Sequence, residues 1–266
     1  MKKIILLVSL FTVLFASAQT QDTLYVWKAG VLVNIQSIKT ADMDSITFQR
    51  PVNPNGINIP GPNVTDIDGN VYASVTNCGL TFTKQNLNVS KYSDGTPIPQ
   101  VTDPTQWASL TTGAWCYYNN DPASEAVYGK LYNWYAVAGI YDVASAANPA
   151  LRKKLAPTGW HVPTDAEWTQ LTDCLGGESV AGGKMKATGT SLWQSPNTDA
   201  TNTTGFTGLP GGYRDDGGTF YIIGYSGNWW SSSESAWFRY LGYDYGYAGR
   251  SNIIETVGFS VRCLRD

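Results

Sequence analysis

The segment between Tyr225 and Asn252 concentrates aromatic side chains whose types suit ligand recognition. Its tyrosines are mixed with glycine, serine and aspartate, and two arginines flank the densest run. Rigid phenol rings provide contact area at a low cost in conformational entropy, and an arginine can hold a carboxylate or a sulfate through paired hydrogen bonds. We therefore predict a ligand-binding face made of Tyr240, Tyr243, Tyr245, Tyr247, Arg239 and Arg250.

The spacing of these tyrosines suggests how they are displayed. On a β-strand, Tyr243, Tyr245 and Tyr247 would share one face. Three such rings would form a platform about two sugar units long, at roughly 3.3 Å per residue. A solvated hairpin without a ligand is the alternative for this segment, whereas the neighbouring Trp229 and Trp230 are predicted to be core residues.

The chain offers few residues for catalysis or metal binding. His161 is the only histidine, and no nucleophile or carboxylate is marked out as its partner, so we interpret it as a packed, hydrogen-bonded residue. Asp66 and Asp68 suggest a calcium loop, but the twelfth position of such a loop would be Asn77 instead of glutamate. A hairpin turn with Gly69 at positive φ is the preferred interpretation. The sequence has no Cys-x-x-Cys and no cysteine–histidine cluster, so we predict no metal and no cofactor.

One local pattern predicts a well-defined helix. Thr164 and Glu167 have the spacing of a capping box, in which the threonine oxygen accepts the amide N–H of Glu167 and the glutamate accepts that of Thr164. Two glycines at 176 and 177 predict the end of the helix. The apolar residues that recur at helical spacing predict one buried face, and they are Trp168, Leu171 and Leu175.

Weaker patterns predict the other elements nearby. Tyr128 to Gly139 has apolar residues on one side and predicts a second amphipathic helix. Short runs of β-branched and aromatic residues predict strands at 71–75, 80–83 and 115–118. A charged fraction of 15% and 27 glycines are typical of a loop-rich secreted domain, in contrast to a protein of long helices.

The start of the chain predicts export. Lys2 and Lys3, an apolar run and Ala16-Ser17-Ala18 form a secretory signal peptide over residues 1–18, and the apolar run is too short to span a bilayer. Removing this peptide changes the formal net charge from −3 to −5, which gives no electrostatic reason to bind nucleic acid or an anionic membrane. We predict a secreted protein without membrane insertion, located in the periplasm, at the cell surface or outside the cell.

Three segments follow the signal peptide. Residues 19–50 form a small N-terminal β module, and residues 51–63 form a linker that contains four prolines among asparagine and glycine. The main domain covers residues 64–266. The strands predicted within the N-terminal module are 23–28, 31–37 and 45–48.

Several motifs resemble known families. The run from Gly159 to Trp168 is similar to a helix start in the formylglycine-generating sulfatase-modifying domain, and Gly258 to Cys263 resembles the last strand of that fold. A closer resemblance, to the Fibrobacter succinogenes major paralogous domain, covers about the last two hundred residues. The motifs that carry it are 102–104, 113–121, 128–134, 205–214 and 229–232. The resemblance implies an α+β fold: a C-type lectin-like domain with two short helices, small antiparallel sheets and long loops.

The cysteines allow more than one covalent arrangement. Four cysteines permit three pairings, and their positions in the sequence do not choose among them. The resemblance implies that Cys263, on the last strand, pairs with a cysteine from the first half of the domain, and Cys116 is the expected partner. This leaves Cys78 with Cys174, which can be free.

The resemblance also bears on function. The sulfatase-modifying enzymes are copper oxidases that use two cysteines upstream of the last strand, and this chain has no cysteine between Gly205 and Gly258. The Glu-Pro-Asn, Gln-Pro-Asp and Trp-Asn-Asp motifs of calcium-dependent lectins are also absent from the sequence. In C-type lectin-like folds the segment before the last strand is the ligand face, which agrees with the tyrosine-rich segment.

These observations favour one function over two alternatives. We expect a secreted, non-catalytic binding or adhesion module that recognises a glycan or a protein ligand at the cell surface. An enzyme with altered chemistry on the formylglycine-generating scaffold is the second hypothesis. A structural component of a cell-surface assembly is the third, with the N-terminal module as its docking piece.

Overall fold

The computed structural model describes residues 22–28, 31–38 and 58–266. The chain divides into two units, Met1–Pro51 and Val52–Asp266. In the first unit, β1 (Asp22–Lys28) pairs antiparallel with β2 (Val31–Ile38), which confirms the first two predicted strands. The predicted signal peptide, the third strand at 45–48 and the first part of the linker lie outside the described residues. Within the described ranges, no helix has the length and apolar character needed to cross a bilayer.

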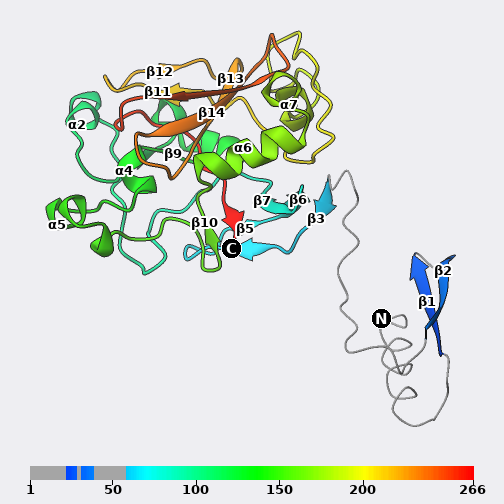
Figure 1. The fold of residues 1–266 in the computed structure, drawn as a ribbon. Coiled ribbons are helices and arrows are strands. Elements are labelled where there is room, and N and C mark those ends of the chain that lie inside the picture. The colour runs from blue at the N-terminus through cyan, green and yellow to red at the C-terminus, as the bar shows by residue number, and fades with distance from the viewer. Residues whose placement is uncertain (1–21, 29–30, 39–57) are drawn as a thin grey trace. The chain divides into compact units, whose positions relative to one another are not determined.

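The second unit is an α+β arrangement of small antiparallel sheets, short helices and long loops, as predicted (Figure 1). Its largest sheet contains β3 (Ile59–Pro60), β6 (Ser74–Asn77), β7 (Leu80–Thr83), β10 (Trp160–His161) and β16 (Leu264–Arg265). The strand order β10-β16-β7-β6-β3 places the first and last of the described strands of this unit in one sheet. The edge strand β3 lies within the range 51–63 that the sequence assigns to a linker.

A three-stranded antiparallel sheet forms the other main layer of this unit. It consists of β13 (Ser226–Trp230), β14 (Trp237–Gly242) and β15 (Ala248–Asn252), with β14 in the centre. Three two-stranded ribbons complete the strands: β4 (Val64–Thr65) with β5 (Val71–Tyr72), β8 (Trp115–Cys116) with β9 (Leu131–Tyr132), and β11 (Tyr213–Arg214) with β12 (Phe220–Tyr221).

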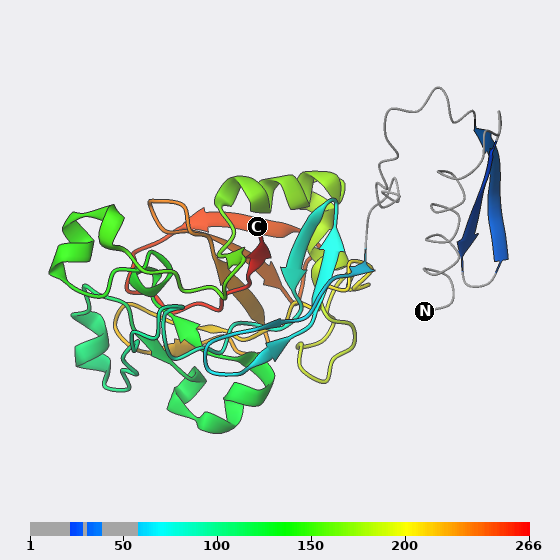
Figure 2. The same cartoon turned by 90° about the horizontal axis from the view of Figure 1, so that it is seen from below.

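The two longest helices of the described residues follow each other in the chain. They are α6 (Asp165–Cys174) and α7 (Glu178–Met185), and they lie beside β14 and β15 (Figures 1 and 2). The shorter α-helices are α2 (Pro104–Ala108), α3 (Glu125–Tyr128), α4 (Trp134–Val137) and α5 (Val143–Ala147). Single 3₁₀ turns occur at η2 (Tyr118–Asn120), η3 (Pro122–Ser124) and η4 (Pro149–Leu151).

The capping box of α6 is confirmed. The Thr164 amide donates to Glu167 Oε2 at 2.7 Å, and the Glu167 amide donates to Thr164 Oγ1 at 3.2 Å. The three predicted apolar positions are buried, since Trp168 is 0% exposed and Leu171 and Leu175 are each 1% exposed. The Trp168 ring packs on Phe82 and Phe206 between the helix and the sheets, so the local pattern correctly identified a core element.

Loss of the cap should destabilise the protein moderately. We expect Thr164→Ala to lower the free energy of unfolding by about 1 kcal/mol, because the Glu167 amide then loses its side-chain acceptor. Thr164→Ser keeps the oxygen and should stay within about 0.5 kcal/mol of the native protein. Denaturant unfolding measures both changes, and equal stabilities for the two variants would contradict the role of the cap.

The predicted helix over residues 128–139 is wrong. Gly129 adopts φ 69° and ends α3, which occupies only Glu125–Tyr128. Leu131–Tyr132 then pairs with Trp115–Cys116 as a β-ribbon, and Asn133 caps the next short helix through the Ala136 amide. Leu131 and Trp134 are buried as their pattern indicated, and Tyr135 is half-buried, but these residues belong to a strand and a separate short helix. A left-handed glycine is the physical reason, because an α-helix cannot continue through it.

The disulfide joins Cys78 and Cys174, which corrects the expected Cys116–Cys263 pair. Cys78 lies in the turn between β6 and β7, and Cys174 is the last residue of α6, with 6.2 Å between their Cα atoms. Cys116 and Cys263 are buried thiols in two different hydrophobic clusters, around Trp107 in the first case and Trp160 in the second. Burial raises the pKa of Cys116 to about 12 and also raises the pKa of Cys263, so both thiols stay protonated.

Candidate functional site

The two faces of the sheet β13-β14-β15 carry different chemistry. Alternation along each strand turns Trp229 and Leu241 toward α6 and α7, where they join a buried cluster with Trp168. The opposite face presents polar and aromatic residues that alternate with these positions. Along the three strands, this second face carries Ser226, Asn228, Phe238, Tyr240 and Ser251.

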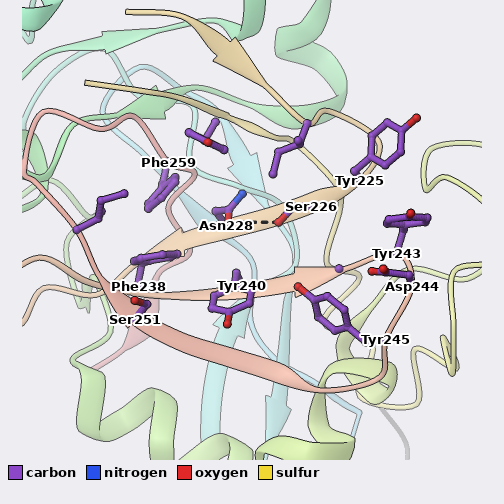
Figure 3. Close-up of a pocket in the computed structure, with 14 residues that line it drawn as sticks. Tyr225, Ser226, Asn228, Phe238, Tyr240, Tyr243, Asp244, Tyr245, Ser251 and Phe259 are labelled. Atoms are coloured by element: carbon purple, nitrogen blue, oxygen red, sulfur yellow. Dashed lines mark hydrogen bonds between the residues drawn. The ribbon is translucent and has the colours of Figure 1, made fainter. Parts of the chain in front are cut away.

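A groove of about 580 Å³ lies on this second face (Figure 3). Figure 3 shows Phe238 and Phe259 at one end, Tyr225, Tyr243 and Tyr245 at the other, and Asn228 between them. Seven aromatic and two aliphatic side chains among the described residues give most of its surface. The complete lining consists of Tyr213, Ile222, Tyr225, Ser226, Asn228, Phe238, Tyr240, Gly242, Tyr243, Asp244, Tyr245, Ser251, Ile253 and Phe259.

Two glycines make room for the rings of the groove. Gly249 lies directly opposite Tyr240 in the register of β14 and β15, and a Cβ atom at Gly249 would overlap the Tyr240 ring. A Cβ atom at Gly242 would overlap the Tyr245 ring in the same way. A glycine within a strand often marks such a close approach. The two tyrosine rings therefore lie against bare backbone, and their positions depend on these glycines.

The tyrosines at 243, 245 and 247 do not share a strand face, so the predicted platform is wrong. Strand β14 ends at Gly242 and β15 begins at Ala248, because Leu241 and Ala248 are the last paired residues and the chain between them forms the connecting loop. Tyr243 and Tyr245 still line the groove. Tyr247 does not line it, and instead stacks on the Tyr245 ring at 3.8 Å and 8°.

The side chain of Lys186 anchors this connecting loop through hydrogen bonds to backbone carbonyl oxygens. Its Nζ donates to the carbonyl oxygens of Gly242 at 2.8 Å, Tyr245 at 2.7 Å and Thr198 at 2.7 Å. Burial lowers the pKa of Lys186 to about 8, so at neutral pH the amine is mostly protonated and has an N–H for each carbonyl. The loop is also fixed by the Gly183 amide, which donates to the Gly246 carbonyl at 2.8 Å. The tyrosines of the loop are therefore displayed on a constrained backbone.

The two arginines are not part of the groove, which corrects their predicted role. Arg239 is 1% exposed and precedes Tyr240 in β14, so alternation turns it to the helix side of the sheet. Its Nη2 lies 3.2 Å from Asp165 Oδ1, and Arg250 Nη2 lies 2.7 Å from Asp165 Oδ2. The Arg250 guanidinium also stacks over the Trp237 ring at 3.8 Å. Both arginines therefore join the sheet to the start of α6 and are not available to a ligand in the groove.

Polar groups on the floor of the groove retain hydrogen-bonding capacity. Asn228 is 5% exposed, and its Nδ2 donates to the Gly212 carbonyl at 3.3 Å. The Ser226 hydroxyl donates to Asn228 Oδ1 at 3.3 Å. These bonds are long, and the amide has a second N–H and a second lone pair to offer. Burial raises the pKa of Tyr213, Tyr240 and Tyr245, so their phenols stay neutral and can donate as well.

His161 and the turn at Asp66 lie outside the groove. His161 Nδ1 lies 2.7 Å from Asp266 Oδ1, and its Nε2 lies 3.0 Å from Glu167 Oε1, which confirms a hydrogen-bonded role and identifies two carboxylate partners that the sequence did not reveal. Asp66 Oδ2 accepts the Tyr72 hydroxyl at 2.5 Å, within the predicted hairpin turn between β4 and β5. In the part of the chain that the structure describes, no group of three or more histidine, cysteine, aspartate or glutamate side chains could hold a metal ion.

Most residues that line the groove were not predicted as ligand contacts, because only Tyr240, Tyr243 and Tyr245 were. Among the missed residues, Tyr213, Asn228 and Phe259 come from separate segments that meet only in the folded chain. Alternation over Ser226–Trp230 could have placed Ser226 and Asn228 on one face. The register that sets Asn228 opposite Tyr240 cannot be obtained from local sequence, because it depends on the loop between β13 and β14.

Comparison with known proteins identifies the domain. No curated protein and no solved structure gives a significant match to the chain. Residues 75–265, which are more than half of the chain, match the Fibrobacter succinogenes major domain. This match includes every strand and loop that lines the groove. The predicted resemblance is thus confirmed, and the chain belongs to the Fibrobacter succinogenes major domain family.

Proposed function

We propose that the protein is a secreted, non-catalytic binding or adhesion module that holds a glycan in the groove on the sheet β13-β14-β15. The observation that carries this proposal is the placement of Tyr240 and Tyr245 over Gly249 and Gly242, beside the amide of Asn228. Aromatic rings offer apolar faces to the C–H groups of a sugar ring, and the amide and phenol groups offer hydrogen bonds to its hydroxyls.

Size and rigidity support binding at this groove. Its volume of about 580 Å³ is within the ordinary range for sites that take small ligands. The loop from Gly242 to Tyr247 is fixed by Lys186, so its tyrosines lose little conformational freedom when a ligand binds. Lost conformational freedom is a main cost of association, and a preorganised face reduces it.

The lining supports binding over bond cleavage. Among the described residues that form the groove, Asp244 is the one carboxylate. Hydrolysis of a glycosidic bond ordinarily uses a pair of carboxyl groups that flank the bond. A single carboxylate at the rim is sufficient to influence which ligands bind, but it does not form such a pair.

The fold and the location form part of the same proposal. A sheet that joins the first and last strands of the unit, together with small sheets and long loops, supports a C-type lectin-like fold. The disulfide between Cys78 and Cys174 supports an oxidising location outside the cytoplasm, as does the leader sequence.

One substitution tests the groove without removing any of its side chains. Gly249→Ala would push the Tyr240 ring off the sheet, and Gly249 does not have the positive φ that would itself strain an alanine. We expect glycan binding on an array to fall at least tenfold, or about 1.4 kcal/mol, with and without calcium. Gly211→Ala is the matched control, since its Cβ would meet only ordinary contacts beyond 3.4 Å.

Three results would contradict the proposal. The first is glycan binding that Gly249→Ala leaves unchanged although the variant is folded. The second is an absence of glycan binding by the native protein together with groove-dependent binding of a protein ligand. The third is turnover of a bound glycan by the native protein.

A further inference from the structure

The described lining of the groove carries a negative charge and no positive charge. The described residues that line it include no lysine and no arginine, and Asp244 supplies the one formal charge. Arg239 and Arg250 are bound to Asp165 on the opposite face of the sheet. Lys186 lies behind the backbone of the loop, and its three N–H groups are already donated to carbonyl oxygens. A ligand in the groove therefore meets a negative group and no available cation.

The aromatic rings of the groove also disfavour an anionic ligand. An aromatic ring has a negative electrostatic potential over its face, which disfavours an anion placed there. Tyr225 and Tyr243 meet edge to face at 5.1 Å beside Asp244, so an anionic group at this end would lie among ring faces and a carboxylate (Figure 3). Moving an anion from water into such surroundings is unfavourable unless a cation pairs with it.

Uncharged sugars meet none of these penalties. Their hydroxyl groups can exchange hydrogen bonds with the Asn228 amide, the Ser226 hydroxyl and the neutral phenols of Tyr240 and Tyr245. Their C–H faces can pack on the rings that the two glycines hold against the sheet. We infer that the groove selects uncharged oligosaccharides and that Asp244 rejects acidic ones, an inference that rests on the proposed glycan-binding function.

This selectivity is tested with backbone-matched glycan pairs. Each pair consists of a neutral oligosaccharide and the same chain carrying a uronate, a sialate or a sulfate. Signals that Gly249→Ala removes are counted as groove-dependent. We expect the neutral member of each such pair to bind at least tenfold more tightly. Equal or tighter groove-dependent binding of the acidic members would overturn the inference and leave the proposed function intact. If no glycan gave a groove-dependent signal, the proposed function itself would be contradicted.

The substitution Asp244→Asn tests whether Asp244 is the residue that disfavours acidic oligosaccharides. We expect the affinity for the acidic members to rise about fivefold, because a repulsion between two surface charges is removed, and the affinity for the neutral members to stay within twofold. A salt titration of the native protein needs no substitution. Higher ionic strength should reduce the difference in affinity between the neutral and the acidic member of a pair, because it screens the same repulsion. If neither the substitution nor the salt changes this difference in affinity, Asp244 does not discriminate against acidic glycans and the inference fails.

Discussion

Removing the Cys78–Cys174 disulfide is expected to lower the free energy of unfolding by about 4–5 kcal/mol. The bond closes a loop with a sequence separation of 96 residues, and the chain-entropy model assigns about 4.7 kcal/mol to a loop of roughly this length. It connects the turn of the β6–β7 hairpin to the last residue of α6, two elements that otherwise meet only by packing. The measurement is denaturant unfolding of a variant with serine at both positions.

The other two cysteines provide the matched control for this prediction. Cys116→Ala and Cys263→Ala remove buried thiols without opening a covalent loop, so each should cost roughly 1–2 kcal/mol. Peptide mapping of the non-reduced protein should recover a linked fragment that contains Cys78 and Cys174. A linked Cys116–Cys263 fragment would contradict the connectivity described here.

Replacing Lys186 with methionine is expected to cost about 3 kcal/mol and to weaken ligand binding more than tenfold. The substitution leaves three carbonyl oxygens, those of Thr198, Gly242 and Tyr245, without their donor, and each unsatisfied buried acceptor costs about 1–3 kcal/mol. Relief from burying the ammonium group offsets part of this cost. Binding should fall because the loop that displays Tyr243 and Tyr245 loses its anchor.

A neighbouring lysine on the same helix gives the control for Lys186. Lys184 Nζ donates to one carbonyl, that of Leu175 at 2.6 Å, and it makes no hydrogen bond to the loop. Lys184→Met should therefore cost about 1 kcal/mol and leave binding unchanged. Thermal unfolding and glycan binding are measured on both variants. Equal effects for the two substitutions would show that Lys186 has no special role in the loop.

Local patterns in the sequence predicted the elements that depend on local interactions. The capping box and the buried face of α6 were correct, because both arise within a dozen consecutive residues. The hairpin turn at Asp66 and the strand Leu80–Thr83 were correct for the same reason. Helix α7 was not predicted, because Gly182 and Gly183 have low helix propensity. Both glycines pack closely on neighbouring backbone, at Tyr247 and Asp199, so tertiary contacts decide the helix there.

The candidate site was predicted only in part. The tyrosine-rich composition identified the correct region, and Tyr240, Tyr243 and Tyr245 do line the groove. The face of each side chain depends on where β14 ends, and the alternation that was assumed to continue through Tyr247 stops at Gly242. The arginines were misplaced because their partner, Asp165, lies 74 and 85 residues away in the sequence. Long-range pairing of this kind cannot be derived from spacing.

The way Lys186 anchors the loop has a consequence for how new specificities could arise on this scaffold. Its ammonium group donates to carbonyl oxygens, which every amino acid supplies, and it makes no hydrogen bond to a side chain of residues 243–245. The side chains at 243, 244 and 245 can therefore be exchanged while the anchor is kept, as long as Gly242 stays free of a Cβ atom wherever a ring lies over it. A combinatorial library randomised at these three positions would vary one end of the groove on an unchanged backbone, much as hypervariable loops do on an antibody framework.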